Sequence, residues 1–389
     1  MNFPEKLLDG VAVEWKSFGE VAKVQRGASP RPISKFITDD ENGIPWIKIG
    51  DTSPNSKYVE NTEQKITPEG ATKSRILKKG DFIMSNSMSF GRPYILNIDG
   101  AIHDGWASIS GFGDRLNADY LYHYLSSDLV QDYWISKINS GSVSNLNSDI
   151  IKSLEIPIPP LAIQAEIVRI LDTFTALTAE LTAELTDRQK QYNYYRDRLL
   201  SFEEGEAEWK TLGEVAIIGT GSRNTNEAVL KGKYPFFVRS QEPRAINEYE
   251  FDETAIITAG DGVGVGKVFH FISEKYALHQ RAYRIVVTTG DIMPKFLFHF
   301  IRFNFSQYLA TTSVHASVTS LRKPMFEKYP VPVPPPTEQA RIVAILDKFD
   351  TLTTSIREGL PREIALRQKQ YEYYRDLLLT FPKSEEVEA

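Results

Sequence analysis

The chain has 389 residues, of which 41% are hydrophobic and 25% are charged, a balance typical of a globular protein with two or three domains. It contains no cysteine, which excludes disulfides, cysteine-ligated zinc and thiol catalysis. The net charge of −6 argues against nonspecific phosphate binding as its main task. We expect a cytoplasmic protein, because no apolar run approaches the ~20 residues that cross a bilayer and the N-terminus does not resemble a signal peptide.

An internal repeat organises the chain. The segment Glu-Trp-Lys-Ser-Phe-Gly-Glu-Val-Ala at 14–22 returns as Glu-Trp-Lys-Thr-Leu-Gly-Glu-Val-Ala at 208–216. In the same way, Tyr-His-Tyr at 122–124 corresponds to Phe-His-Phe at 298–300. The ends of the two copies agree and their middles do not, which is typical of one scaffold that carries two different surfaces.

Each copy begins with short strands and continues into a helix. The strands of the first copy are predicted at 46–49, 81–84 and 94–96. Those of the second copy are predicted at 236–238, 255–258, 267–269 and 283–287. The helices are predicted at 117–138, with Asn117 as the cap and Leu129 on the apolar face, and at 294–310. Each copy is therefore predicted to be an α+β globule.

A long helix follows each globule. The first runs from Ile-Pro-Ile-Pro-Pro at 156–160 to Gln-Lys-Gln-Tyr-Asn-Tyr-Tyr-Arg-Asp at 189–197, and the second has the matching segments at 331–336 and 368–376. Apolar and aromatic residues recur at steps of three and four, which is the seam of a coiled coil. The seam of the first helix is Ile163, Ile167, Ile170, Phe174, Leu177, Leu181, Leu185, Arg188, Tyr192, Tyr195 and Leu199. That of the second is Ile342, Ile345, Phe349, Leu352 and Ile356, then Ile364, Arg367, Tyr371, Tyr374 and Leu378 after an interruption at 359–361. Two matched seams predict that the helices pair antiparallel with each other.

The seam of the first helix contains a stutter, because one step is four residues where three are due. Its origin is a tandem repeat, in which Thr178, Ala179, Glu180 and Leu181 are followed by Thr182, Ala183, Glu184 and Leu185. A four-residue insertion changes both the length and the phase of a helix. We therefore predict that this repeat is a spacer.

Together these elements predict an α+β fold with two globular domains, two long antiparallel coiled-coil helices that separate them, and a pseudo-two-fold internal repeat. The domains are predicted at 1–153 and 208–328, and the helices at 154–207 and 329–389. The helical segment 154–207 holds ten acidic and five basic side chains, whereas 208–328 holds twelve acidic and fifteen basic ones. The acidity therefore lies largely in the helices, which leaves room for basic faces on the globules.

No motif in the sequence indicates catalysis. The glycine-rich segment at 260–267 fails as a phosphate-binding loop, because its spacing is wrong and Val268 follows the lysine where Ser or Thr is needed. A strand is predicted after it, so a glycine-rich hairpin is the better interpretation. The tetrapeptides of amino-methyltransferases are absent, and the six histidines show no ligand spacing. We expect no catalytic residue, no metal site and no cofactor site in this chain.

Basic, amide and hydroxyl side chains collect in the turn-rich parts of both globules. Those of the first are Arg26, Ser29, Arg31, Lys48, Asn86, Ser87, Arg92, Asn145 and Asn147. Those of the second are Arg223, Asn224, Arg239, Ser240, Gln241, Lys267, Gln280, Arg281, Arg322 and Lys323. The forked side chains among them match the hydrogen-bonding edges of guanine and adenine, so we predict that the two sets contact DNA.

Three repeated motifs resemble the specificity subunit of type I restriction–modification systems, and they span essentially the whole chain. They are the Glu-Trp-Lys openings, the Pro-rich segments at 156–160 and 331–336 with a Gln behind each, and the Arg-Gln-Lys-Gln-Tyr close of each helix. The tandem Thr-Ala-Glu-Leu is also similar to a short repeat in some members. The resemblance implies two target-recognition domains, each reading half of a split, asymmetric site in double-stranded DNA, with the helices setting the spacing.

The same resemblance implies partners that carry the chemistry. These are two methyltransferase subunits, which use S-adenosylmethionine, and restriction subunits, which use ATP and Mg, where they are present. Two other functions stay open from the residues alone. One is a self-sufficient DNA-modifying enzyme with an unrecognised motif. The other is a protein–protein scaffold, which suits the acidic helices but not two divergent globules.

Overall fold

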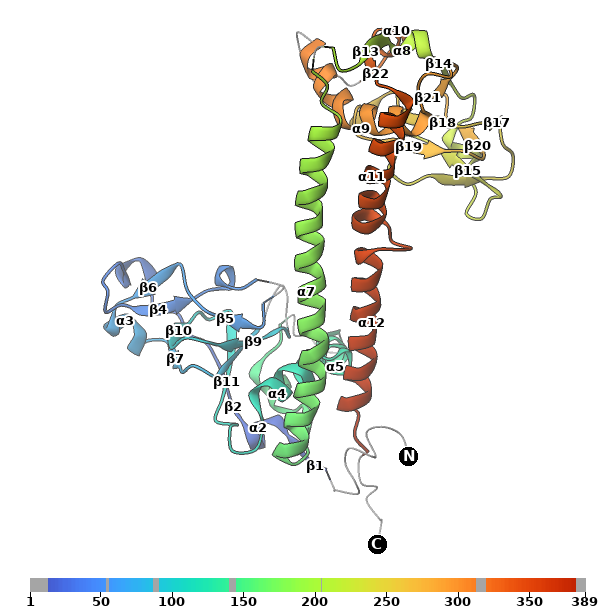
Figure 1. Cartoon of the computed structure of the whole chain (residues 1–389). Coiled ribbons are helices and arrows are strands. Elements are labelled where there is room, and N and C mark those ends of the chain that lie inside the picture. Colours follow the sequence, from blue (N-terminus) through green and yellow to red (C-terminus); the bar gives the residue numbers. More distant parts are fainter. Residues whose placement is uncertain are drawn as a thin grey trace. The chain divides into compact units, whose positions relative to one another are not determined.

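The computed structural model describes residues 13–53, 56–86, 91–139, 145–203, 205–312 and 320–382 (Figure 1). The chain divides into two compact units: Met1–Glu180 together with Ile364–Ala389 forms unit 1, and Leu181–Glu363 forms unit 2. Each unit combines one globule with segments of long helices. The divisions between the units fall inside helices, because α7 (Leu161–Leu199) and α12 (Leu360–Leu379) each contribute to both.

Unit 1 contains two five-stranded sheets, in the orders β3-β6-β4-β10-β7 and β2-β11-β8-β9-β5, and an antiparallel pair of β1 with β12. Its strands are β1 (Glu14–Ser17), β2 (Lys23–Arg26), β3 (Ile37–Thr38), β4 (Ile44–Ile47), β5 (Tyr58–Val59), β6 (Gln64–Ile66), β7 (Arg75–Leu77), β8 (Phe82–Ser85), β9 (Pro93–Leu96), β10 (Gly100–Ile102), β11 (Trp106–Ser110) and β12 (Glu155–Ile158). Its short helices are α2 (Phe18–Val21), α3 (Pro68–Thr72), α4 (Ala118–Leu125), α5 (Asp128–Asn139) and α6 (Ser148–Lys152), with 3-10 turns at Ile33–Lys35 and Ile49–Asp51.

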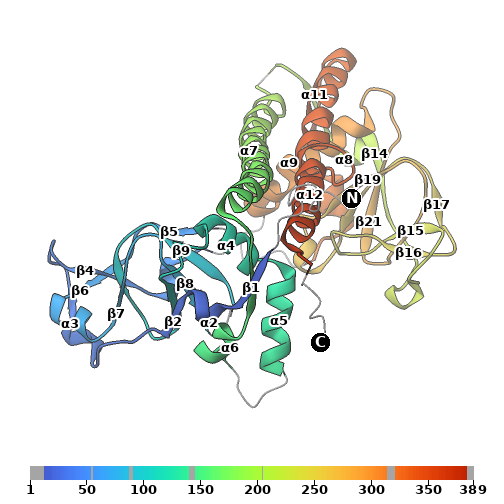
Figure 2. The ribbon, with the colours of Figure 1, turned by 90° about the horizontal axis from the view of Figure 1, so that it is seen from below.

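Strand β8 separates the two main cores of unit 1. Phe82 and Met84 face a core shared with α2, α4 and α5, whereas Ile83 points to a second core between the sheets, as the two-residue period of a strand requires. Helix α4 packs against β9 at the edge of the first core (Figure 2). The long helices complete this core, with Leu171 from α7 and Leu378 from α12 fully buried in it.

Unit 2 repeats the plan with four-stranded sheets in the orders β14-β21-β18-β19 and β16-β15-β20-β17, and an antiparallel pair of β13 with β22. Its strands are β13 (Glu208–Thr211), β14 (Ala216–Thr220), β15 (Tyr234–Phe237), β16 (Arg244–Ile246), β17 (Phe251–Asp252), β18 (Ala255–Ala259), β19 (Phe269–Ile272), β20 (Lys275–Leu278), β21 (Ala282–Val287) and β22 (Pro330–Val333). Its helices are α8 (Leu212–Val215), α9 (Pro294–Thr312), α10 (Lys323–Glu327) and α11 (Pro336–Thr354), with 3-10 turns at Thr225–Glu227 and Gly262–Gly264.

The helix segments within each unit run antiparallel to one another (Figure 1). In unit 1, Phe174 of α7 stacks on Tyr374 of α12, with ring centroids 5.2 Å apart. In unit 2, Tyr195 of α7 stacks on Phe349 of α11 at 5.7 Å. The two pairs occupy the same positions of the sequence repeat. The α+β class, the internal repeat and the antiparallel helices predicted from the sequence are therefore confirmed.

A buried glutamine attaches each helix to its globule. The Nε2 atom of Gln164 donates to the carbonyls of Pro159 (2.8 Å) and Arg115 (2.9 Å), and its Oε1 accepts from the N–H of Asn117 (2.7 Å). Gln339 makes the same three kinds of bond to backbone groups of unit 2, at 2.7–2.8 Å. Because all these partners are backbone atoms, one fully buried side chain per unit fixes the helix against the globule.

Some local predictions were wrong. The helix predicted at 117–138 is two helices, because Ser126 and Ser127 interrupt it; Asn117 does cap α4, but Leu129 is exposed, since the break changes the helical phase. Ile356 is not a seam residue: it lies beyond the end of α11 and is 83% exposed. The interruption that follows includes Gly359, with φ of +80°, where a Cβ would lie 2.3 Å from the carbonyl oxygen of Thr351.

The strand predicted at 267–269 begins only at Phe269. The glycine-rich segment before it connects two antiparallel strands, β18 and β19, so the hairpin interpretation is confirmed. Among the described helices, none combines the length and the apolar character that crossing a membrane demands.

Candidate nucleic-acid interface

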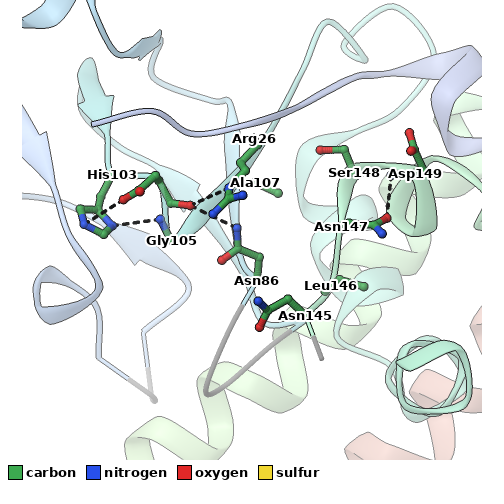
Figure 3. A pocket seen from close by; sticks show the side chains of 11 residues that line it. Arg26, Asn86, His103, Gly105, Ala107, Asn145, Leu146, Asn147, Ser148 and Asp149 are labelled. Carbon is green, nitrogen blue, oxygen red and sulfur yellow. Dashed lines mark hydrogen bonds and ion pairs between the residues drawn. The ribbon is translucent and has the colours of Figure 1, made fainter. Parts of the chain in front are cut away.

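In unit 1, four segments far apart in sequence meet at one end of the sheet that contains β8 and β11. They are the end of β2 at Arg26, Asn86 directly after β8, the turn at 103–105 before β11, and the segment 145–147 that leads into α6. Together they line a hollow of about 490 Å³ (Figure 3). Backbone bonds hold them in place, since the N–H of Asn86 donates to Gly105 O and that of Leu146 to Asn86 O, both at 3.2 Å.

Asp104 lines this hollow and connects several predicted site residues. Its carboxylate accepts from the Ser29 hydroxyl (2.9 Å) and forms an ion pair with Arg31 (3.4 Å). Its backbone carbonyl accepts from Arg26 Nε and Asn86 Nδ2, both at 3.3 Å. The structure thus brings three side chains from the end of β2 and the loop after it, those of Arg26, Ser29 and Arg31, together with Asn86 from the end of β8.

The charge state of Asp104 follows from these neighbours. Burial alone would raise the pKa of its carboxyl group. The Ser29 hydroxyl and the nearby His103 and Arg31 outweigh that effect and lower the pKa, so the group is a carboxylate near neutral pH. A fixed negative charge therefore orients the Ser29 hydroxyl and the Arg31 guanidinium group, whereas Arg26 and Asn86 are held by the backbone carbonyl of the same residue.

The remaining predicted residues of unit 1 behave differently from one another. Asn145 and Asn147 line the hollow, and Asn147 also caps α6 by accepting from the N–H groups of Asp149 and Ile150. Lys48 and Arg92 do not line it: Lys48 forms an ion pair with Glu63 (3.0 Å), and Arg92 lies over the ring of Tyr94. Ser87 lies outside the described residues.

Unit 2 builds its equivalent site on the same backbone framework. The N–H of Gly260 donates to Arg281 O (2.9 Å), and that of Leu321 donates to Gly260 O (2.7 Å), which matches the two bonds of Asn86 in unit 1. The N–H of Arg281 also donates to His279 Nδ1 (3.0 Å), as that of Gly105 donates to His103 Nδ1 (2.9 Å).

A glycine occupies the same crowded position in both frameworks. A Cβ at Gly27 would lie 2.1 Å from the carbonyl oxygen of His103, and a Cβ at Gly221 would lie 1.9 Å from that of Leu278. The backbone of the loop after β2 or β14 therefore passes directly over the neighbouring strand end, and only glycine permits this approach.

The side chains on the framework of unit 2 are different. Asp261 accepts from Arg239 Nη1 on Oδ1 (2.7 Å) and from Arg281 Nη1 on Oδ2 (3.1 Å). Burial alone would raise the pKa of Asp261, but the two arginines together lower it. Arg239 and Asp261, with Arg244 and Ser240, line a hollow of about 380 Å³.

Other predicted residues of unit 2 lie around this centre. Arg223 is held by Glu227 and Glu248, both at 3.0 Å, and the N–H of Asn224 donates to Glu227 in the same turn. Lys323 lies 3.5 Å from Glu327 within α10. The side chains of Gln241, Lys267, Gln280 and Arg322 are exposed.

The residues that organise the two sites, Asp104 and Asp261, were not among the predicted site residues. They come from different positions of the repeat, because Asp104 corresponds to Gln280 whereas Asp261 follows Gly260, the counterpart of Asn86. A signal for one framework existed in the sequence, since His103 and His279 match when the two copies are aligned. In the described part of the chain, no group of three or more His, Asp or Glu side chains is placed to hold a metal ion.

Comparisons with known proteins agree on one family. The model of the type I restriction modification DNA specificity domain matches residues 11–188 and again 205–366. The chain is 36% identical over 415 residues to the EcoR124I/EcoR124II specificity subunit of Escherichia coli, covering 100% of this chain and 99% of that protein. It is 32% identical to a putative type I specificity subunit, S.HindORF215P, of Haemophilus influenzae, with 98% of each covered.

Solved structures show the same fold at lower identity. A crystal structure of a type I restriction–modification S subunit from M. genitalium covers 98% of this chain and 100% of its own, with a TM-score of 0.58 at 14% identity. That of the HsdS subunit from Thermoanaerobacter tengcongensis covers 95% of this chain and 97% of its own, with a TM-score of 0.53 at 16% identity.

Proposed function

The chain belongs to the type I restriction–modification DNA specificity family, and on this premise we propose that each unit reads one half of a bipartite, asymmetric DNA target. The chain is the DNA-recognition subunit of its complex and not the catalytic one. Its place of action would be the cytoplasm, where that DNA lies.

One observation supports the division into two readers. The backbone bonds around Asn86 and Gly260 are the same, but the side chains that project from the two frameworks differ. Unit 1 presents amides together with Arg26, whereas unit 2 presents arginines held by Asp261. A shared scaffold with divergent polar groups is what two heads reading different sequences require.

The base-contacting residues are proposed from the predicted sets. Arg26, Asn86 and Asn145 of unit 1 line its hollow, as Arg239 and Ser240 do in unit 2. We propose that Lys48 and Arg223 contact the DNA backbone, because neither lines the hollow around Asp104 or Asp261 in its unit. Phosphate contacts position a protein on DNA, and base contacts specify the sequence.

We further propose that two methyltransferase subunits, which use S-adenosylmethionine, dock on the helices, and that restriction subunits, which use ATP and Mg, join the same complex where they are present. Both units offer one equivalent exposed aromatic on their helices: Tyr194 is 59% exposed and Tyr373 is 63% exposed. Two matching surfaces suit two copies of one partner.

An alternative, in which the chain modifies DNA alone, predicts a different result in a simple assay. The purified chain would be incubated with target DNA and labelled S-adenosylmethionine, with and without the methyltransferase subunit. We expect label in the DNA only when the partner is added, because this chain supplies recognition and no methyl-transfer chemistry. Label transferred by the chain alone would contradict the proposal.

A further inference from the structure

The site of unit 2 contains an arrangement of charges that invites a more specific interpretation. One carboxylate, Asp261, holds two arginines, and each of its oxygens takes one guanidinium group. Arg239 comes from the loop after β15, and Arg281 from the turn before β21. Arg244 of β16 lines the same hollow and forms no ion pair with any side chain of the described ranges.

The exposure of Asp261, Arg239 and Arg281 shows which side chain is enclosed by the protein and which are accessible to a ligand. The side chain of Asp261 is only 21% exposed, whereas those of Arg239 and Arg281 are 44% and 63% exposed. Each of these two bonds uses a single Nη1 atom, and a guanidinium group carries five N–H donors. Most donors of each planar fork are therefore left for another molecule.

The arrangement does little for the stability of the fold. Exposed ion pairs contribute little to the free energy of folding, and here one partly buried carboxylate is surrounded by an excess of positive charge. A carboxylate behind an arginine does restrict the orientation of the guanidinium plane, however. Orientation matters for bidentate recognition of a flat hydrogen-bonding edge and matters much less for contact with a phosphate as a point charge.

We propose that Arg239 and Arg281 read guanine in the half-site of unit 2, and that Asp261 is the positioning residue that aligns both forks. The proposal rests on the proposed function of the same site. Arginine pairs with O6 and N7 of guanine in the major groove through two parallel hydrogen bonds. The half-site of unit 2 therefore contains at least one G·C pair at a specified position.

The test uses the assembled complex of this chain with its methyltransferase subunits. Its target is first determined by sequencing methylated DNA, and binding is then measured on duplexes that carry 7-deazaguanine at single positions. This base keeps normal pairing but lacks N7. We expect one or more positions in the half-site of unit 2 at which the replacement weakens binding by up to the roughly 5–150-fold that a whole bidentate contact contributes, because N7 is one of its two acceptors and O6 remains.

Variants identify the residues responsible. R239A or R281A removes a whole bidentate contact and is expected to weaken binding to the intact target about 5–150-fold. In each variant, 7-deazaguanine at the base pair that the missing arginine would read should cause no further loss. R281K keeps the charge but loses the fork, so it should resemble R281A in its discrimination between target and scrambled DNA.

D261N tests the positioning role. It removes a negative charge and should reduce the ratio of target to scrambled-site affinity without weakening binding to the scrambled site. R115A is the matched control, because Arg115 is an exposed arginine of unit 1 that pairs with Glu14 and lines neither hollow; it should change neither the affinity for the target nor the discrimination.

Two outcomes would overturn the inference: a half-site of unit 2 without a specified G·C pair, or arginine variants that lose affinity equally for target and scrambled DNA. The second outcome would make both arginines phosphate contacts. Neither outcome would touch the proposed function, which fails separately if unit 2 has no sequence preference at all.

Discussion

Deleting Thr182–Leu185 is expected to shorten the unread gap of the DNA target and to leave both half-sites unchanged. These residues are the second copy of the tandem repeat, and they lie inside the continuous helix α7. Along α7, unit 1 gives way to unit 2 between Glu180 and Leu181, so the repeat spans the point where the helix passes from one unit to the other.

Helix geometry sets the size of the expected step. Four residues contribute ~6 Å of length and ~400° of rotation, which is one full turn and about 40° more. One base pair of DNA turns about 34–36°, so the loss of four residues nearly matches the loss of one base pair in phase. Because the deletion shortens only α7, the partner helices α11 and α12 become ~6 Å too long for it. This difference can be absorbed at 355–359, where α11 has ended and α12 has not begun.

Sequencing of methylated DNA from cells that carry the deletion measures this effect. We expect at least about a 100-fold loss of methylation at the original target, because mis-spaced half-sites forfeit the contacts of one unit, and a new target with the same halves and a shorter gap. Thr182→Ala is the matched control, since it alters the repeat but keeps its length. A changed half-site, or an unchanged gap, would rule out the spacer role.

The second large effect concerns Leu378, near the end of the chain. Its side chain is fully buried in the core of unit 1, together with Leu379 and Phe381. Leu378→Asp would place a carboxylate among apolar side chains, and we expect a loss of at least about 4 kcal/mol in the free energy of unfolding of unit 1. The stability of the globule at the start of the chain should thus depend on a residue near the end of the chain.

Hydrogen exchange followed by mass spectrometry can separate the two units. In the Leu378→Asp variant, protection should fall across residues 13–139 and persist across residues 208–312. Leu366→Asp is the control, because Leu366 lies on the same helix but is exposed. Retained protection at 13–139, or equal loss in both units, would mean that α12 does not complete the core of unit 1.

The features that sequence predicted well are those encoded by local periodicity. The repeat, the two helices and most of their seams follow from spacing alone, and Asn117 was recognisable as a cap. The failures arose where a short break changed the phase of a helix, as at Ser126–Ser127 for Leu129, or ended it, as before Ile356. Such breaks depend on hydrogen bonds that periodicity does not contain.

The site was harder to predict, because its organisation is non-local. Arg26 and Arg31 meet Asp104 only because β2 pairs with β11, which no short-range pattern reveals. The same tertiary contacts show that Lys48 and Arg223 are already engaged by acidic neighbours. Residue type could therefore suggest candidate DNA-binding residues, but only the fold shows which of them gather around Asp104 or Asp261 and which lie elsewhere.

The most direct test of two independent readers is the exchange of residues 208–328 for the equivalent segment of another family member with a different target. Methylated DNA is then sequenced from cells that carry the hybrid chain and the unchanged partner subunits. We predict that one half of the target changes to that of the donor, while the other half and the gap stay the same. A change in both halves would contradict the account, because it would mean that the two units do not read DNA separately.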